Sequence, residues 1–340
     1  MKIFNRNMIM AALCITAVLT AAGCSNKNNK GEEPSGSTAP ITEAPKEDLP
    51  EESLPEEAAT RTVSTVMGDI EVPSDPQRVV VNWYIGDAFA LELNVVGYFA
   101  WAHEAMPFYD KFASAALIEN WEPEDVMKLD PDLIITYSED DFSKFNKIAP
   151  VLVIPESNIT SLERAKIIGE ATGHTAQAEA AVQNFEAKLA EAKEKLQDDA
   201  FKDKTFSINE DWGSGSYGVY YETGSRGGTL IYETLELQKP EKLEQLIEET
   251  GEGRGGLSYE VAADYFGDYM IWFRPYDATE DTPSEYETTP IWETIPAVRE
   301  GRVVTVPGNM SGLFYYSDVA SLTGQLDYLL GKLVALTENE

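Results

Sequence analysis

The chain has 340 residues, enough for two domains of average size, and 43% of them are hydrophobic, which excludes global disorder. Its 59 acidic side chains against 26 basic ones give a formal charge of −33, which excludes a basic surface for nucleic acid. Two histidines and two cysteines are too few for a disulfide framework, a cysteine-rich zinc module or most histidine-based catalysis.

The first 23 residues are typical of a bacterial lipoprotein signal peptide. Lys2 and Arg6 precede an apolar stretch that is too short to span a bilayer, and the small residues 21–23 lead directly to Cys24. Cys24 is therefore the expected lipidation site, with an ordinary secretory signal as the alternative. Diacylation of Cys24 would anchor the protein stably to the extracytoplasmic face of the cell membrane.

Residues 24–62 predict a disordered, acidic, proline-rich tether that starts at the lipidated cysteine. They contain five prolines, no aromatic residue, and nine acidic side chains against four basic ones. Such a segment cannot bury enough apolar surface to fold, and its prolines and like charges keep it extended. A net charge of −30 remains on residues 63–340, so the folded part is itself acidic.

Residues 63–156 predict an N-terminal α/β lobe. After a hairpin over 65–72, apolar β-rich runs alternate with short helices, which is typical of a parallel sheet. The expected strands are 78–81, 95–98, 133–136 and 151–154, and the expected helices are 87–93, 123–129 and 143–148.

Residues 157–199 predict a helical connection dominated by one long helix over 175–197. Apolar residues recur at spacings of three and four from Ala178 to Leu196, and Thr175 can cap the start. Glu191 and Lys195 form a favourable pair one turn apart. At 1.5 Å per residue this helix would be about 33 Å long, enough to run along two lobes.

Residues 200–340 predict a C-terminal α/β lobe, in which strand and helix signals resume. The fold class is therefore α/β, with two α/β lobes bridged by a single long α-helix. The expected strands are 205–209, 217–221, 268–273 and 302–306, a further element covers 259–265, and helices cover 229–237 and 317–336.

Catalytic motifs are missing from the sequence. There is no nucleophile elbow, phosphate-binding loop or zinc-protease helix. Residues 213–218 match a dinucleotide fingerprint by letter, but a β-like sequence follows where a helix must begin, so a plain loop is favoured. His103 and His174 are the only imidazoles, which makes a direct metal site a weak interpretation. We therefore expect neither an enzyme nor a metal held by the protein's own side chains.

Aromatic residues gather at the predicted strand ends and loops, where ligands bind in open α/β sheets. Aromatic walls with a few polar anchors suit a bulky small molecule, although burial in the core is an equal alternative for any one tyrosine. Arg226 is followed by two glycines that let a ligand approach the backbone, with pairing to an acid as its alternative. The expected ligand-binding residues are Trp83, Tyr84, Trp101, Tyr137, Trp212, Tyr217, Tyr220, Arg226, Arg274, Phe314, Tyr315 and Tyr316.

Five segments are distributed over nearly the whole mature chain. Their order and spacing are specific to one protein family. The segments are PQRVV at 76–80, EDVMKLDPDLII at 124–135, KIAP at 147–150, RGGTLIY at 226–232 and WETIPAVREGRV at 292–303. With them, residues 63–340 resemble the iron-siderophore substrate-binding lipoproteins of bacterial ABC importers. The fold of that family, two α/β lobes bridged by a long helix, agrees with the elements predicted above.

Within the family, the run from Tyr217 to Tyr220 followed by Arg226 most resembles the ferric hydroxamate binders of Gram-positive bacteria. The resemblance implies a ligand in the cleft between the lobes, with Arg226 on its hydroxamate oxygens. It further implies delivery of the ferric siderophore to an ABC permease for iron uptake, with Glu124 and Glu233 as the docking residues. The family's tryptophan two residues before the arginine is Gly224 here.

The siderophore supplies all the ligands of its iron, so the resemblance implies no covalent cofactor. The protein is also expected to act as a monomer. A neutral or cationic ferric hydroxamate suits the acidic lobes better than a triply anionic ferric catecholate.

Two other functions stay open. The same fold carries haem or cobalamin, and tyrosines can ligate haem iron. An interaction or sensor lipoprotein without a transported ligand is the other alternative.

Overall fold

The computed structural model describes residues 59–276, 278 and 281–337, so the predicted signal peptide, Cys24 and most of the tether lie outside the described residues. The first described element is a hairpin of β1 (Thr60–Thr65) and β2 (Gly68–Pro73). β1 starts inside the segment expected to be a tether, which ran to residue 62. The sequence of β1 is polar and gives no strand pattern. In the structure, β1 is held in place by Arg61, because its guanidinium donates to the carbonyl of Glu170 at 2.7 Å.

A parallel five-stranded sheet forms the N-terminal lobe, in the order β5-β4-β3-β6-β7. Successive residues of β3 point to two different cores, Val79 and Val81 to one and Val80 to the other. Burial on both faces explains why these strands read as continuous apolar runs in the sequence. The strands are β3 (Val79–Asn82), β4 (Val95–Phe99), β5 (Ala116–Leu117), β6 (Leu133–Thr136) and β7 (Val151–Val153).

Short helices cover this sheet. They are α1 (Ile85–Ala90), the 3₁₀ turn η1 (Tyr109–Ser114), α2 (Pro123–Met127) and α3 (Asp140–Phe145). The prediction of strands at 78–81, 95–98, 133–136 and 151–154 is confirmed to within a residue or two. The two-residue strand β5 was not predicted, because it is too short to carry a pattern.

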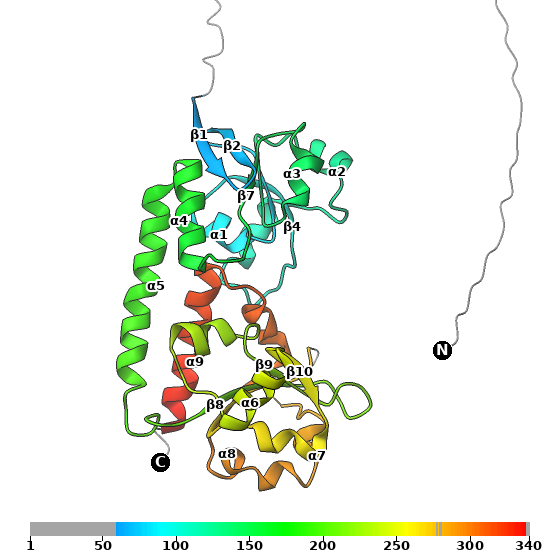
Figure 1. Cartoon of the computed structure of the whole chain (residues 1–340), viewed down its shortest axis with the longest axis vertical. Helices are drawn as coiled ribbons and strands as arrows, with labels where there is room; N and C mark the ends of the chain where they lie inside the picture. Colours follow the sequence, from blue (N-terminus) through cyan, green and yellow to red (C-terminus); the bar gives the residue numbers. More distant parts are fainter. Residues whose placement is uncertain (1–58, 277, 279–280, 338–340) are drawn as a thin grey trace, which may run out of the picture. The chain divides into compact units, whose positions relative to one another are not determined.

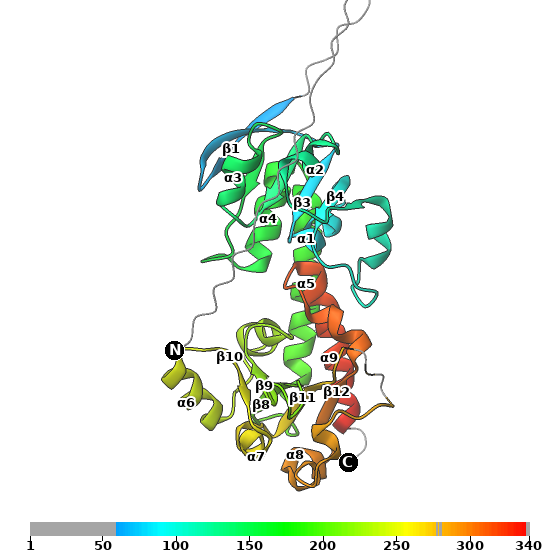
Figure 2. The same ribbon diagram turned by 90° about the vertical axis from the view of Figure 1, so that its right-hand side faces the viewer.

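A mixed sheet forms the C-terminal lobe, in the order β10-β9-β8-β11-β12. Figure 2 shows β10 on the left and β12 on the right of this sheet. β8, β11 and β12 are parallel, whereas β9 and β10 run antiparallel to their neighbours. β10 was not predicted, since its sequence contains two glycines. The strands are β8 (Phe206–Asp211), β9 (Val219–Glu222), β10 (Arg254–Leu257), β11 (Tyr269–Phe273) and β12 (Val303–Val306).

The helices of this lobe are mostly single turns. The expected helix over 229–237 is one π-helical turn, η2 (Thr229–Thr234), and α6 (Glu241–Thr250) was not predicted. The others are α7 (Tyr259–Ala262), η3 (Ala263–Tyr265), η4 (Tyr286–Thr288), η5 (Trp292–Thr294), α8 (Pro296–Arg299) and η6 (Gly308–Phe314). Over the described ranges, no helix combines the length and the apolar character needed to cross a bilayer.

The connection between the lobes consists of α4 (Ser161–Thr172) and α5 (Thr175–Lys195). α4 begins with a capping box, in which Thr160 and Glu163 satisfy each other's backbone N–H groups. α5 is the long helix that the sequence predicts, and its Glu191–Lys195 ion pair is confirmed at 2.8 Å. The cap differs, because His174 occupies the N-cap position and Thr175 is the first helical residue.

A second long helix, α9 (Val319–Thr337), lies beside α5 (Figure 1). Lys188 on α5 bonds both carboxylate oxygens of Asp327 on α9 at 2.6 Å. Phe185 and Leu329 belong to one apolar core that reaches from Val81 in the N-terminal sheet to Ile271 in the C-terminal sheet. The two-lobe α/β fold is thus confirmed, and α9 joins α5 in connecting the two sheets.

A buried charge cluster lies where α1, α4 and the start of α9 meet. Arg164 donates to Asp87 at 2.6 Å and to the carbonyl of Ser317 at 3.3 Å. Asp318 is also buried, and it accepts from the backbone and the hydroxyl of Ser321, both at 2.8 Å. Arg164 therefore pairs with Asp87, while Asp318 is a second carboxylate held away from solvent in the same cluster. α1 approaches this closely because residue 86 is glycine, where a Cβ would lie 2.1 Å from the Asp318 carboxyl carbon.

Stability should depend on the protonation of Asp318. Burial, and then the charge of Asp87, raise the pKa of Asp318 from 3.8 to about 6. Between those values the folded state holds a proton that the unfolded chain has lost, so the free energy of unfolding should fall as the pH rises from 4 to 6. Asp318→Asn should remove this contribution and raise the free energy of unfolding at pH 7 by roughly 1–3 kcal/mol.

Urea denaturation at a series of pH values measures this effect. Asp327→Asn, which removes an exposed carboxylate from the same helix, is the matched control and should keep the wild-type pH dependence. A pH dependence for Asp318→Asn that parallels the wild type would contradict the prediction.

Candidate ligand-binding site

Aromatic side chains follow the carboxyl ends of strands in both sheets. Trp83 comes directly after β3, Tyr137 after β6 and Trp212 after β8. Parallel strands of one sheet end at the same edge, so in each sheet these side chains lie at the strand ends, where ligands bind in open α/β folds.

The larger cavity has a volume of about 840 Å³ and takes most of its wall from the N-terminal lobe. That volume lies within the range of small-molecule sites. Two residues of the C-terminal lobe, Tyr276 and Tyr315, complete the wall. The lining is formed by Asn82, Trp83, Phe99, Ala100, Trp101, Ala102, His103, Leu117, Ile118, Glu119, Tyr137, Tyr276 and Tyr315.

A neighbouring cavity of about 520 Å³ is lined by the C-terminal lobe. Its lining is formed by Glu210, Asp211, Trp212, Gly213, Arg226, Pro275, Tyr276, Glu285, Ser311 and Tyr315. Tyr276 and Tyr315 line both cavities, so the two form one continuous cleft between the lobes. We refer to these two joined cavities as the cleft.

The aromatic wall is held by edge-to-face contacts. The ring of Trp101 lies 5.9 Å from that of Trp83 and 5.6 Å from that of Tyr315. Trp83 adopts a positive φ of 70°, a backbone conformation that is uncommon for a bulky residue. Edge-to-face pairs of this kind add stability beyond the area that they bury, which holds the wall in place before a ligand arrives.

Tyr316 joins the two lobes at this wall. Its hydroxyl accepts from the backbone N–H of Trp101 at 2.7 Å and donates to the carbonyl of the same residue at 3.2 Å. Burial raises the pKa of Tyr316 well above its usual value, so the hydroxyl keeps its proton at any physiological pH.

His103 lies in the cleft beneath two tyrosines. Its ring is 5.5 Å from that of Tyr276 and 5.9 Å from that of Tyr315, both edge to face. A Cβ on Gly312 would lie 2.0 Å from the His103 ring, so only glycine lets the 308–314 turn come this close. Partial burial lowers the pKa of His103, which favours the neutral imidazole at neutral pH.

Arg226 is the guanidinium among the residues that line the cleft, and it is paired. Its Nε and Nη2 donate to the two carboxylate oxygens of Glu210 at 3.2 and 3.1 Å. The guanidinium also lies 5.2 Å from the centre of the Tyr315 ring. Arg226 therefore lines the cleft and also pairs with an acid, so both interpretations of this residue agree with the structure.

Two further carboxylates make this part of the cleft acidic. Asp211 accepts from the Tyr259 hydroxyl at 2.6 Å and from the backbone N–H of Tyr286 at 2.8 Å. Glu285 accepts from the backbone N–H of Ser214 at 3.1 Å, which fixes the glycine-rich 213–218 loop. These bonds hold both carboxylates in place without neutralising their charge.

The structure places half of the predicted ligand-binding residues in the wall of the cleft: Trp83, Trp101, Tyr137, Trp212, Arg226 and Tyr315. Tyr217 and Tyr220 contact the Trp212 ring, 6.0 and 5.5 Å away between centroids, at the edge of the cleft.

Four predicted residues do not line the cleft. Tyr84 is buried and donates its hydroxyl to the carbonyl of Ile154 at 2.6 Å. Phe314 packs on Phe273 in the core, and Tyr316 is taken up by its bonds to Trp101. Arg274 is nine-tenths buried and bonds both oxygens of Glu287, at 2.9 and 2.7 Å. Within pairs such as Trp83-Tyr84 and Tyr315-Tyr316, only the first side chain faces the cleft.

Several residues that line the cleft were not predicted. Tyr276 lies in the loop after β11, and Glu210 and Asp211 are the last two residues of β8. The position of Glu210 and Asp211 just before Trp212 was a usable signal, because strand ends indicate where the site lies. The abundance of acidic residues hid it.

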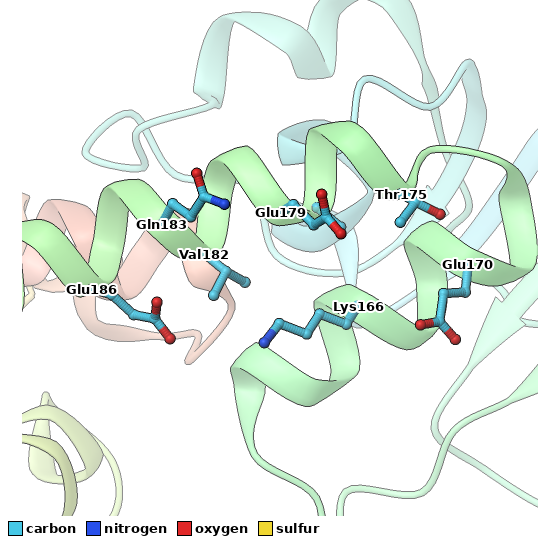
Figure 3. A pocket seen from close by; sticks show the side chains of 8 residues that line it. Lys166, Glu170, Thr175, Glu179, Val182, Gln183 and Glu186 are labelled. Atoms are coloured by element: carbon cyan, nitrogen blue, oxygen red, sulfur yellow. The ribbon is translucent and has the colours of Figure 1, made fainter.

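A third concavity, of about 400 Å³, lies between α4 and α5 (Figure 3). Its visible side chains are mainly charged or polar, including Lys166, Glu170 and Glu179. It has no aromatic wall and lies away from the strand ends, so we do not assign the ligand to it. Nor does any group of three or more His, Cys, Asp or Glu side chains in the described ranges come together to hold a metal ion.

Two α/β lobes with an aromatic cleft at their strand ends define a substrate-binding protein. The chain belongs to the periplasmic binding protein family, whose model matches residues 111–310. This is a family of binding proteins and not of enzymes.

Relatives of known cargo support this assignment. The iron(3+)-hydroxamate-binding protein YxeB of Bacillus subtilis is 29% identical over 98% of each chain. The iron(3+)-hydroxamate-binding protein FhuD of the same organism is 32% identical over 81% of this chain and 87% of its own. The crystal structure of a periplasmic binding protein component of a ferrichrome ABC transporter, also from B. subtilis, is 29% identical, with a TM-score of 0.65 over 80% of this chain and 99% of its own.

Removing the hydroxyl that joins the lobes should weaken the fold. Tyr316→Phe leaves the N–H and carbonyl of Trp101 without their partner, and we expect the free energy of unfolding to fall by about 1–3 kcal/mol. Urea denaturation measures the loss. Tyr217→Phe, at an exposed tyrosine of the same lobe, should leave the midpoint unchanged, and an equal midpoint for Tyr316→Phe would refute the role given to its hydroxyl.

Proposed function

We propose that the protein captures a ferric siderophore of the hydroxamate type in the cleft and delivers it to an ABC permease for iron uptake. One observation carries the proposal: Arg226 presents a guanidinium inside an aromatic cleft whose other charged groups are mainly carboxylates. The two iron(3+)-hydroxamate-binding relatives support the choice of cargo, and the ferrichrome transporter component supports the choice of partner.

The chemistry of the cleft suits a hydroxamate complex. Such a ligand surrounds its iron with its own oxygens, so the protein has to supply apolar contact and a few hydrogen-bond donors. The rings of Trp83, Trp101 and Tyr315 supply the contact. Arg226 supplies the donors, since a guanidinium carries five N–H groups and no acceptor.

The charge of the cleft argues against an anionic cargo. Asp211, Glu285 and Glu119 line it, and the positive charge of Arg226 is already balanced by Glu210. A triply anionic ferric catecholate, or haem with its propionates, would meet net repulsion there. A neutral or cationic ferric hydroxamate would not.

Loss of Arg226 should weaken binding strongly. Hydrogen bonds to a charged group contribute about 1.5–3 kcal/mol, so Arg226→Ala should lower the affinity for ferrioxamine B about 10- to 150-fold. The titration follows quenching of tryptophan fluorescence, since Trp83, Trp101 and Trp212 line the cleft.

The matched control is Arg254→Ala, because Arg254 on β10 pairs with Glu222 on β9 and does not line the cleft. It should bind ferrioxamine B with wild-type affinity. Tighter binding of a ferric catecholate than of any ferric hydroxamate would sink the proposal, and so would a Soret band on addition of haemin that is lost when Tyr276 is replaced.

The protein would work at the membrane surface as a lipid-anchored monomer. A diacylated Cys24 holds the chain on the extracytoplasmic face, and the acidic segment that follows gives the lobes reach toward the permease. Glu124 on α2 and Glu233 on η2 are the docking residues. Both side chains are exposed, one on each lobe, which suits contact with cationic residues of a permease.

Docking should be separable from cargo binding. The double variant Glu124→Ala, Glu233→Ala should bind ferrioxamine B as the wild type does, and cells that carry it should lose most of their iron uptake from this complex. Glu179→Ala, Glu186→Ala on α5 removes two exposed carboxylates elsewhere and should leave uptake intact. Normal uptake by the first variant would exclude these two residues as the docking pair.

A further inference from the structure

Glu210 fixes the orientation of the Arg226 guanidinium by a bidentate contact. The carboxylate bonds the edge of the guanidinium formed by Nε and Nη2, at 3.2 and 3.1 Å. The side chains of both residues are largely buried, with 16% of Arg226 and 9% of Glu210 exposed. A planar guanidinium held along one edge presents its other edge, on the side of Nη1, in a fixed direction.

The ring of Tyr315 restrains the same guanidinium from its face. The guanidinium carbon lies 5.2 Å from the centre of that ring and 5.8 Å from the centre of the Phe273 ring. An arginine side chain normally loses considerable rotamer freedom when it binds a ligand. Here the carboxylate and the rings have already removed much of that freedom.

The pair also sets the charge of the cleft. Arg226 alone would add a full positive charge beside Asp211 and Glu285, whereas the Glu210–Arg226 pair adds none. The C-terminal side of the cleft therefore offers N–H donors while it stays electrostatically negative. That combination suits a ligand with carbonyl-type oxygens and a positive charge.

We propose that Glu210 is a specificity-determining residue. It positions Arg226 as a donor and cancels its charge, so that the cleft prefers a ferric hydroxamate that carries an ammonium group over the same complex without one. This inference rests on the proposed function, because it refines the class of hydroxamate cargo that the cleft selects.

The test compares two ligands that differ by one charge, ferrioxamine B with its free ammonium and its N-acetyl derivative. Glu210→Gln keeps one acceptor for Arg226 but leaves the guanidinium charge uncompensated. We expect the affinity for both ligands to fall, and the preference for ferrioxamine B over the acetylated complex to drop by about fivefold relative to the wild type. Titration by tryptophan fluorescence at low ionic strength gives both affinities.

Two variants separate charge from structural damage. Glu287→Gln breaks the equivalent bidentate pair with Arg274, which does not line the cleft, and it changes the net charge of the protein by the same amount. It should leave the ligand preference unchanged even if it lowers the melting temperature. The double variant Glu210→Gln, Arg226→Gln restores the charge balance and should return the preference to within about twofold of the wild type.

The outcomes are distinct. A Glu210→Gln variant that loses affinity for both ligands by the same factor would overturn the inference, because a residue with a purely structural role does not change their ratio. A change of the same size in Glu287→Gln would also overturn it. A wild-type protein that binds neither ligand would refute the proposed function itself, whereas a wild-type protein that binds both with no shift in Glu210→Gln would refute only the role of Glu210.

Discussion

The buried ion pair between Asp87 and Arg164 underlies the geometry of the cleft. It ties α1 to α4, and Arg164 reaches across to the carbonyl of Ser317 at the entry to α9. Trp83 lies four residues before Asp87, and Tyr316 lies one residue before Ser317. The same cluster therefore sets where the aromatic walls of the two lobes meet. Breaking such a pair leaves an uncompensated buried charge, which costs several kcal/mol, so the position of the walls is strongly specified.

Much of the fold could be predicted from the sequence because burial leaves clear patterns. β3 and β6 are covered on both faces and read as apolar runs, and α5 shows its buried stripe from Ala178 onward. Elements without such a pattern were not predicted. β1 is polar and half exposed, β10 contains two glycines, and β5 is a two-residue strand at the edge of its sheet, paired with β4. Their existence depends on tertiary contacts that no local window contains.

The site could be predicted only in part, for a related physical reason. Strand ends locate a cleft, so Trp83, Tyr137 and Trp212 were found. Which of two adjacent aromatic residues faces the cleft depends on side-chain direction, and the sequence does not carry that information: Tyr315 lines it, whereas Tyr316 turns away to bond Trp101. The position of Glu210 at a strand end could have marked it as a cleft residue, but its role could not be predicted, because that role depends on its bidentate contact with Arg226.

The core shared along α5 and α9 bears on how the protein can be divided. Phe185 on α5 and Leu329 on α9 pack in the same apolar cluster as residues of both sheets. Cutting the chain between the sheets would strip one of them of the helix that covers it and expose that apolar face to water. The two lobes are thus distinct as sheets but not as independent folding units, and a fragment that carries a single sheet is a poor substitute for the intact protein in any dissection of its function.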